Sequence, residues 1–191
     1  MRSTTSDKVR FLRAFVAHPR QVGAVLPTSA RAVGDMLDLA DLASARLVVE
    51  LGSGTGSHTG HILDRLGPDA RLVAFEIDPG MAAGLRARLP DPRLRVVTGS
   101  AADVVEVLAG ERAEVVVSAL PFTSLPADLG RTILHRTVRV LAPGGTLLVL
   151  QYSPLLAPRL NGLFASVTRK ISLRNVPPAF LYACRDPRDT G

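Results

Sequence analysis

One stretch decides how this chain folds: Leu47-Val48-Val49-Glu50-Leu51-Gly52-Ser53-Gly54-Thr55-Gly56. A short apolar run that carries one acidic residue leads into three glycines, which alternate with small polar residues. The segment that follows has Ile62, Leu63 and Leu66 at helical spacing. A strand, a glycine turn and a helix in this order expose backbone N–H groups to a ligand, because glycine accepts positive φ and carries no Cβ.

The spacing of the glycines separates this loop from two phosphate-binding motifs. A P-loop needs a lysine after its last glycine, and no lysine lies near this loop. The dinucleotide fingerprint is Gly-x-Gly-x-x-Gly, whereas this loop is Gly52-x-Gly54-x-Gly56, with Glu50 two residues before the first glycine. A carboxylate at the strand tip favours a cationic ligand with an amino-acid head over an anionic pyrophosphate. An incidental glycine turn in another α/β protein is the alternative.

The composition is typical of one globular domain. The chain has 191 residues, 47% of them hydrophobic, which is enough to bury about 70% of the unfolded surface. Cys184 is its one cysteine, so no internal disulfide can form and a reducing compartment is expected. Asp7, Lys8, Arg10 and Arg13 interrupt any early apolar run. We therefore predict a cytoplasmic chain without a signal peptide or membrane span.

The positive charge lies at the two ends of the chain. The net charge is +6; residues 1–20 carry five basic side chains against one acidic, and residues 159–191 carry six against two. Residues 4–17 predict a basic amphipathic helix with Phe11 and Phe15 on its apolar face. An anionic surface, lipid or nucleic acid, is the implied partner, and residues 4–17 are a candidate membrane anchor. The alternatives are a basic surface that only aids solubility and a helix that packs on its own domain.

From residue 46 onward, strand and helix patterns alternate, as in a doubly wound parallel sheet. Thr28 or Ser29 can cap a helix that ends near Leu39. Only residues 175–178 separate the last two strands, so these must pair antiparallel. We predict an N-terminal segment, 1–45, and a catalytic domain, 46–191. The predicted strands are 46–51, 71–77, 94–98, 114–120, 145–152, 167–174 and 179–184, and the predicted helices are 57–66, 79–89, 101–109 and 127–141.

Acidic and polar residues stand at the ends of the predicted parallel strands. Glu76 follows Gly56 by twenty residues, where a doubly wound fold places the acid that binds ribose hydroxyls. Asp78 before Pro79 predicts a helix N-cap with proline at the first helical position. Leu141-Ala142-Pro143-Gly144-Gly145 predicts a turn from helix to strand.

The Glu-x-Gly-x-Gly-x-Gly form resembles the motif of S-adenosylmethionine (SAM) methyltransferases. The resemblance implies a Rossmann-like class I SAM-methyltransferase fold, with a seven-stranded sheet that contains one antiparallel strand and is preceded by N-terminal helices. It also implies SAM as the cofactor and S-adenosylhomocysteine as its product, with no metal. Ser100 stands where this family usually has an aspartate that binds adenine. The implied cofactor-binding residues are Glu50, Gly52, Ser53, Gly54, Gly56, Glu76, Ile77, Ser100, Ala101, Ser118 and Leu120.

Four further stretches are similar to the bacterial phospholipid N-methyltransferases, the small soluble type, over roughly residues 8–185. They lie within 11–29, which includes Pro19-Arg20-Gln21-Val22-Gly23-Ala24, and at 118–121, 151–154 and 174–179. The resemblance implies stepwise methylation of phosphatidylethanolamine towards phosphatidylcholine, by a monomer at the inner face of the cell membrane. A more distant resemblance is to the rRNA adenine dimethyltransferases. Those enzymes carry a further helical domain, and they have an Asn at the position of Ser118. We therefore expect no nucleic-acid partner.

The implied methylation of a lipid amine calls for a second set of residues, which contact the lipid. Tyr152, at the tip of the fifth strand, is the first candidate to orient the lipid amine, and His58 after the glycine loop is the weaker one. Each residue also has a plain structural alternative, such as a core ring or a hairpin cap. An N-methyltransferase of RNA adenine or of a small-molecule amine, and a non-catalytic protein of this fold, are the competing functions. The candidate substrate-binding residues are Arg20, Phe122, Lys170, Arg174 and Asn175.

Overall fold

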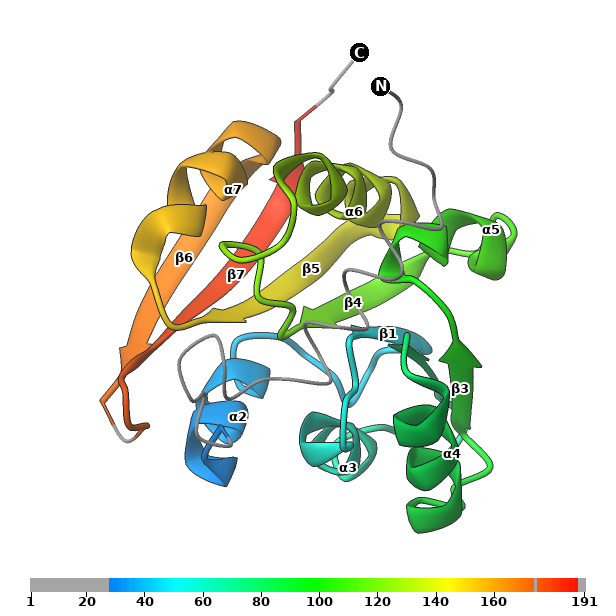
Figure 1. Cartoon of the computed structure of the whole chain (residues 1–191). Coiled ribbons are helices and arrows are strands. Elements are labelled where there is room, and N and C mark those ends of the chain that lie inside the picture. Colours follow the sequence, from blue (N-terminus) through cyan, green and yellow to red (C-terminus); the bar gives the residue numbers. More distant parts are fainter. Residues whose placement is uncertain (1–27, 174, 189–191) are drawn as a thin grey trace.

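The computed structural model describes residues 28–173 and 175–188 (Figure 1). This part of the chain forms one seven-stranded sheet with the order β3-β2-β1-β4-β5-β7-β6. The strands are β1 (Leu47–Leu51), β2 (Arg71–Glu76), β3 (Leu94–Thr98), β4 (Ala113–Ser118), β5 (Leu141–Gln151), β6 (Phe164–Ser172) and β7 (Ala179–Pro187).

The sheet is parallel except for one strand. Strands β1 to β5 pair in parallel, whereas β7 runs antiparallel to both β5 and β6. The predicted fold, including the antiparallel pairing of the last two strands, is confirmed. The parallel strands therefore end together at one end of the sheet, where the order reverses between β1 and β4 and where ligands bind in open α/β sheets.

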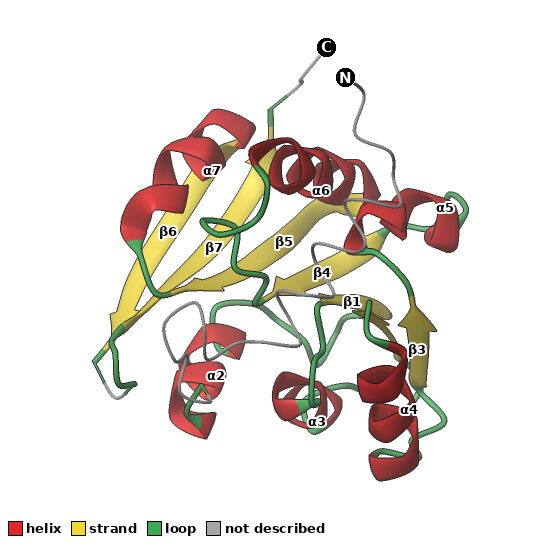
Figure 2. Cartoon of the chain, viewed as in Figure 1, coloured by secondary structure: helices red, strands yellow, loops and turns green. Residues whose placement is uncertain are grey.

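Helices cover both faces of the sheet (Figure 2). Helices α5, α6 and α7 lie on one face, and α2, α3 and α4 lie on the other (Figure 1). Two short 3-10 turns, η2 (Ala101–Asp103) and η3 (Pro154–Leu156), precede α5 and α7. The helices are α2 (Ala30–Leu37), α3 (Ser57–Leu63), α4 (Pro79–Arg88), α5 (Val104–Leu108), α6 (Ala127–Val140) and α7 (Ala157–Leu163).

Strand β1 lies between two hydrophobic cores, one on each face of the sheet. Leu47, Val49 and Leu51 belong to the core under α5, α6 and α7. Val48 points to the opposite face and joins the core under α2 and α3. Because successive side chains of a strand alternate between faces, a strand that is buried on both faces needs a continuous apolar run. The run that opens the glycine motif is therefore apolar for structural reasons, and Glu50 is the exception within it.

Two predicted helix starts are present. Ser29 caps α2 by accepting a hydrogen bond from the Ala32 N–H at 3.2 Å. Asp78 caps α4 by accepting from the Met81 N–H at 2.8 Å, and Pro79 is the first helical residue.

Two local predictions were wrong. The sequence predicted no helix between β5 and β6, but α7 forms there, with Pro158 in its first turn, where a missing N–H costs nothing. Residues 141–145 were predicted as a turn, but β5 begins at Leu141 directly after α6. The additional residues are accommodated by an irregular register opposite Ala113 and Val115.

Candidate active site

The glycine loop joins β1 to α3 at the carboxyl end of the parallel strands. Gly52, Gly54 and Gly56 have φ values of 80°, 53° and 82°, in the left-handed region that favours glycine. A Cβ at Gly52 would lie 2.6 Å from the Leu120 side chain, and one at Gly56 would collide with Leu85. A Cβ at Gly54 would meet no heavy atom within 4 Å. A side chain at Gly52 or Gly56 would therefore have to displace a buried leucine, whereas Gly54 borders open space.

Glu50 is a buried carboxylate just before this loop. Its Oε2 accepts a hydrogen bond from Thr59 Oγ1 at 2.6 Å. Its Oε1 has no partner among the residues that the structure describes. Burial raises the pKa of Glu50 to about 7, an effect that the Thr59 hydrogen bond opposes and the nearby Glu76 carboxylate strengthens. One acceptor oxygen thus remains unused at a position where a cationic group would offset the cost of burial.

Glu76, at the end of β2, connects the loop to the neighbouring strand. Its Oε2 accepts from the Gly54 N–H at 2.7 Å, and its Oε1 accepts from the Asp78 N–H at 2.8 Å. Each carboxylate oxygen can take a second donor. Glu76 therefore holds the tip of the glycine loop and still has lone pairs for ligand hydroxyls.

Ser53 and Ile77, two more of the predicted cofactor residues, lie next to these carboxylates in the sequence. The N–H groups of Gly52 and Ser53 both donate to the Phe75 carbonyl at 2.9 Å, which holds the loop against β2. Ser53 Oγ is buried and has no partner in the described part of the chain. Ile77 is buried directly after Glu76.

At the end of β3, Ser100 has a structural task. Its hydroxyl accepts from the Ala102 N–H at 3.1 Å and caps η2, while Ala101 is buried beside it. The hydroxyl proton of Ser100 stays available as a donor, so this position offers a donor where the family pattern has a carboxylate acceptor.

The tips of β4 and β5 are tied together. Ser118 is fully buried, and its Oγ accepts from the Leu120 N–H at 3.4 Å. The Leu120 carbonyl accepts from the buried Gln151 side-chain amide at 2.7 Å. Phe122 lies buried in the core with α6, a placement that agrees with its structural alternative. No role was predicted for Gln151 or Thr59, although both lie within or next to the stretches that carry the resemblance.

Two predicted substrate-site residues hold the segment before α2. The Tyr152 hydroxyl is hydrogen-bonded to Thr28 Oγ1 at 2.8 Å. Asn175 Oδ1 accepts from the Ser29 N–H at 2.8 Å, and its Nδ2 donates to the Pro177 carbonyl at 2.7 Å. Residues far apart in the sequence therefore meet at the start of α2, beside the end of β5.

The other candidate residues are more scattered. Lys170 on β6 forms an ion pair with Asp35 of α2 at 3.2 Å. His58, in the first turn of α3, is buried with no partner for its Nε2 among the described residues, and burial lowers its pKa to about 4. Arg20, Arg174 and residues 4–17 lie outside the described residues.

The site fits the group that the sequence implies. SAM carries an amino-acid head with an ammonium group and a carboxylate, a cationic sulfonium, and ribose hydroxyls. Glu50 offers an unused buried carboxylate oxygen, Gly54 borders open space, and Glu76 has free lone pairs at the loop tip. Within 28–173 and 175–188, no group of His, Cys, Asp or Glu side chains could hold a metal ion, and no helix is long and apolar enough to cross a membrane.

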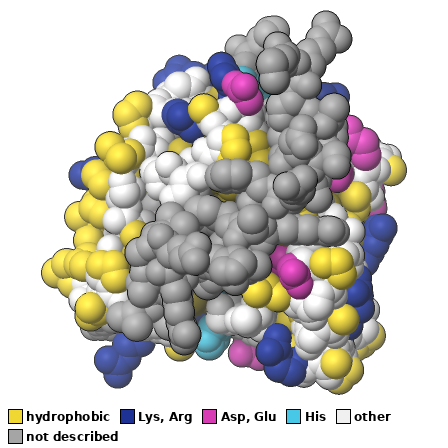
Figure 3. All heavy atoms as spheres, in the orientation of Figure 1, with side chains coloured by type: hydrophobic (Ala, Val, Ile, Leu, Met, Phe, Trp, Pro, Cys, Tyr) yellow, Lys and Arg dark blue, Asp and Glu magenta, His cyan; other side chains and the backbone are white. Residues whose placement is uncertain are grey.

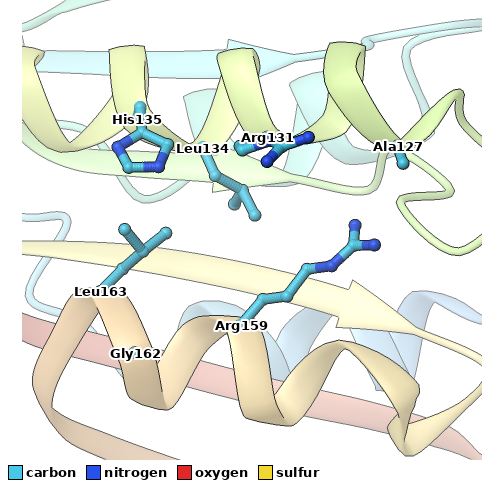
Figure 4. A pocket seen from close by; sticks show the side chains of 7 residues that line it. All are labelled: Ala127, Arg131, Leu134, His135, Arg159, Gly162 and Leu163. Atoms are coloured by element: carbon cyan, nitrogen blue, oxygen red, sulfur yellow. The ribbon is translucent and has the colours of Figure 1, made fainter.

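A separate cavity of about 500 Å³ lies between α6 and α7 (Figure 4). Leu134 and Leu163 point toward each other across it, and Arg131, His135 and Arg159 line it as well. None of the predicted site residues lines this cavity.

Comparisons with known proteins agree with this geometry. A family model described as a methyltransferase domain matches residues 48–145, from β1 into β5. An ornithine lipid N-methyltransferase from Singulisphaera acidiphila is 35% identical over 189 residues, which cover 96% of this chain and 98% of that protein.

Solved structures share the fold. The N-methyltransferase NodS from Bradyrhizobium japonicum, in complex with S-adenosylhomocysteine, has a TM-score of 0.69 at 16% identity, covering 95% of this chain and 99% of its own. The O-methyltransferase TomG from Streptomyces achromogenes, in complex with SAM, has a TM-score of 0.66 at 18% identity, covering 97% and 91%.

Proposed function

The chain belongs to the family of SAM-dependent methyltransferases, and we propose that it methylates the amine of a membrane-lipid head group. The observation that carries this proposal is its likeness to the ornithine lipid N-methyltransferase, which extends over nearly the full length of both chains. The motifs that resemble phospholipid N-methyltransferases support the same class of acceptor, a primary amine on a lipid.

Two lipids are candidate acceptors. The sequence motifs favour phosphatidylethanolamine, and the Singulisphaera relative favours an ornithine lipid. Both present a primary amine on a short aliphatic arm. They differ in the anion near that amine, which is a phosphodiester in the first lipid and a carboxylate in the second. The cations that we propose for this anion are Arg20, Lys170 and Arg174, and all three charges suit either lipid.

SAM, when bound, supplies a methyl group on a cationic sulfur. We propose that Glu50 and the glycine loop hold its amino-acid head, that Glu76 accepts from its ribose hydroxyls, and that Ile77, Ser100 and Ala101 border the adenine. Ser118 and Leu120, at the end of β4, then lie beside the reacting centre. The chain contributes alignment of the acceptor nitrogen with the methyl group and exclusion of water.

The acceptor amine must lose its proton before it can react, because a primary ammonium has no lone pair. We propose that Tyr152 orients the amine; its position directly after β5 and the hydrogen bond of its hydroxyl to Thr28 support this role. His58 is a weaker candidate, because a pKa of about 4 makes its imidazole a poor proton acceptor at neutral pH. Asn175 is proposed to act by holding the start of α2 in place.

A lipid acceptor requires the enzyme to work at a membrane surface. We propose that residues 4–17 form a basic amphipathic helix that binds anionic lipid, with about 1 kcal/mol for each basic residue near such a surface. The chain is proposed to act as a monomer at the inner face of the cell membrane.

The test is methyl transfer to defined acceptors. The protein is incubated with methyl-labelled SAM and vesicles that contain phosphatidylethanolamine or an ornithine lipid, and in parallel with RNA or a soluble amine. Label in an extracted lipid supports the proposal. Label only in RNA or in the soluble amine contradicts it and supports the competing function. A Glu76→Ala variant controls for label that is carried over without catalysis.

A further inference from the structure

Four large apolar side chains are exposed in the described part of the chain, and all four lie at one end of the sheet. Leu155 is 72% exposed, Ile171 45%, Leu173 77% and Val176 73%. Three of them belong to the hairpin between β6 and β7, and Leu155 lies in η3 just after β5. We call these four residues the apolar tip.

The strand register places the apolar tip at the end of the sheet that carries the active site. Ile171 pairs with Phe180, and Phe180 pairs with Gln151, the last residue of β5. The chain therefore leaves the sheet at the same level after β5 and after β6. This is the carboxyl end of the parallel strands, where the glycine loop also lies. Figure 3 shows apolar side chains gathered at the left margin, where Figure 1 places the end of β6 and the start of β7.

Polar contacts hold the hairpin while its apolar side chains face outward. Asn175, inside the hairpin, is buried and bonded to the Ser29 N–H and the Pro177 carbonyl. Ser172 Oγ donates to Asp35 at 3.0 Å, next to the Lys170 ion pair with the same carboxylate. Leu173 and Val176 are thus exposed next to residues that hydrogen bonds hold in place, and a cluster of exposed apolar side chains is typical of an interaction site.

The charges beside the apolar tip indicate the chemistry of the partner. Lys170 and Ser172 face α2, so the alternation of β6 turns Arg169 and Ile171 toward the opposite face. Arg169 is exposed there. On the same face Arg159 lines a cavity of about 260 Å³ together with Leu155. Exposed apolar side chains bordered by arginines match the interface of an anionic bilayer, which offers acyl chains below and phosphates above.

We propose that the apolar tip inserts into the interfacial layer of an anionic membrane, with Arg159 and Arg169 at the level of the head groups. This contact is separate from the one proposed for residues 4–17, and it rests on the proposed function because a lipid acceptor gives the membrane its role. It brings the end of the sheet that carries the glycine loop against the bilayer. A lipid amine then reaches the methyl donor while its acyl chains stay in the membrane.

The first test uses the absence of tryptophan from the chain. Leu173→Trp places a single tryptophan at the apolar tip, and Asp69→Trp, in an exposed turn before β2, is the matched control. Vesicles of phosphatidylcholine and phosphatidylglycerol should shift the emission of Leu173→Trp to the blue, and brominated acyl chains should quench it. The emission of Asp69→Trp should not change.

Three results would overturn the proposal. Unchanged Leu173→Trp emission, whether or not the protein sediments with the vesicles, means that the tip does not enter the membrane. A blue-shifted emission without vesicles at every protein concentration means that another part of the chain covers the tip. A shift that grows with protein concentration means that a second copy covers it.

The second test separates this proposal from the proposed function. Leu173→Glu places a charge at a 77% exposed position, so folding should be retained. Methylation of vesicle lipid should fall about ten-fold or more, because the free energy of burying one leucine side chain corresponds to at least this factor in membrane affinity. Methylation of a monomeric short-chain lipid should not change. Equal rates on vesicles for both proteins would overturn the insertion. If the unmodified protein methylates neither lipid form, the proposed function fails, and the fluorescence result still decides the insertion.

Discussion

If Glu50 holds the cationic cofactor as we propose, its carboxylate should make cofactor binding dependent on pH. Burial raises its pKa from the ordinary 4.5 to about 7 in the free protein. A cationic ligand stabilises the ionised form, so binding must release the proton that Glu50 holds at lower pH. SAM affinity should therefore increase as the pH rises through 7, and Glu50→Gln should remove this dependence.

The size of the effect follows from the pKa. If only ionised Glu50 binds the ligand well, the apparent dissociation constant exceeds its limiting value by about 11-fold at pH 6 and about 1.3-fold at pH 7.5. The affinity should then change by roughly eight-fold across this range. Glu50→Gln should also weaken binding by about 10- to 100-fold near pH 7.5, since a hydrogen bond to a charged group contributes about 1.5–3 kcal/mol.

Isothermal titration calorimetry of SAM between about pH 6 and about pH 7.5 measures both quantities. Higher pH is avoided because the amine of the ligand titrates near 8. Repeating the titration in buffers of different ionisation enthalpy should detect about half a proton released per SAM bound near pH 7. An affinity that stays constant across the range in the unmodified protein, or the same slope in Glu50→Gln, would refute the assignment of this carboxylate to the cationic ligand.

Three other changes probe different parts of the site. Glu76→Ala removes the acceptor of the Gly54 N–H together with the carboxylate proposed for the ribose hydroxyls, and it should weaken SAM binding by about ten-fold or more, since a hydrogen bond to a charged group contributes about 1.5–3 kcal/mol; unchanged affinity by calorimetry would disprove the ribose role. Tyr152→Phe breaks the bond to Thr28 and should lower kcat toward a lipid acceptor while leaving the SAM dissociation constant unchanged; equal kcat would show that the hydroxyl only holds the fold. Deletion of residues 1–17 should abolish most vesicle sedimentation and retain SAM binding, and salt-insensitive sedimentation of the truncated chain would contradict the anchor.

The sheet could be predicted because its sequence signals are local. The run from Leu47 to Leu51 is buried on both faces, and such runs are apolar wherever they occur. The short spacing between β6 and β7 dictated antiparallel pairing in the same way. Helix α7 was not predicted, since no element was assigned between the strands 145–152 and 167–174; Pro154 and Pro158 lie there in first turns, where proline is accepted.

The site was predictable only in part, because several of its contacts join segments that are distant in the sequence. Glu50 and the glycines could be identified from their spacing, but the Thr59 hydroxyl that bonds Glu50 carries no motif of its own. Asn175 was expected near the substrate, and it forms a hydrogen bond with the N–H of Ser29, which is 146 residues away in the sequence. No periodicity reports such a contact, since it depends on where β7 places the hairpin relative to α2.

The mass of the lipids after reaction tests the proposed methylation of a lipid head group. The unmodified protein is incubated with SAM and vesicles that contain both phosphatidylethanolamine and an ornithine lipid, and the extracted lipids are analysed by mass spectrometry. At least one of these lipids should gain methyl groups on its head-group nitrogen, and S-adenosylhomocysteine should appear in matching amount. Unmodified lipids in the presence of a protein that binds SAM would contradict it.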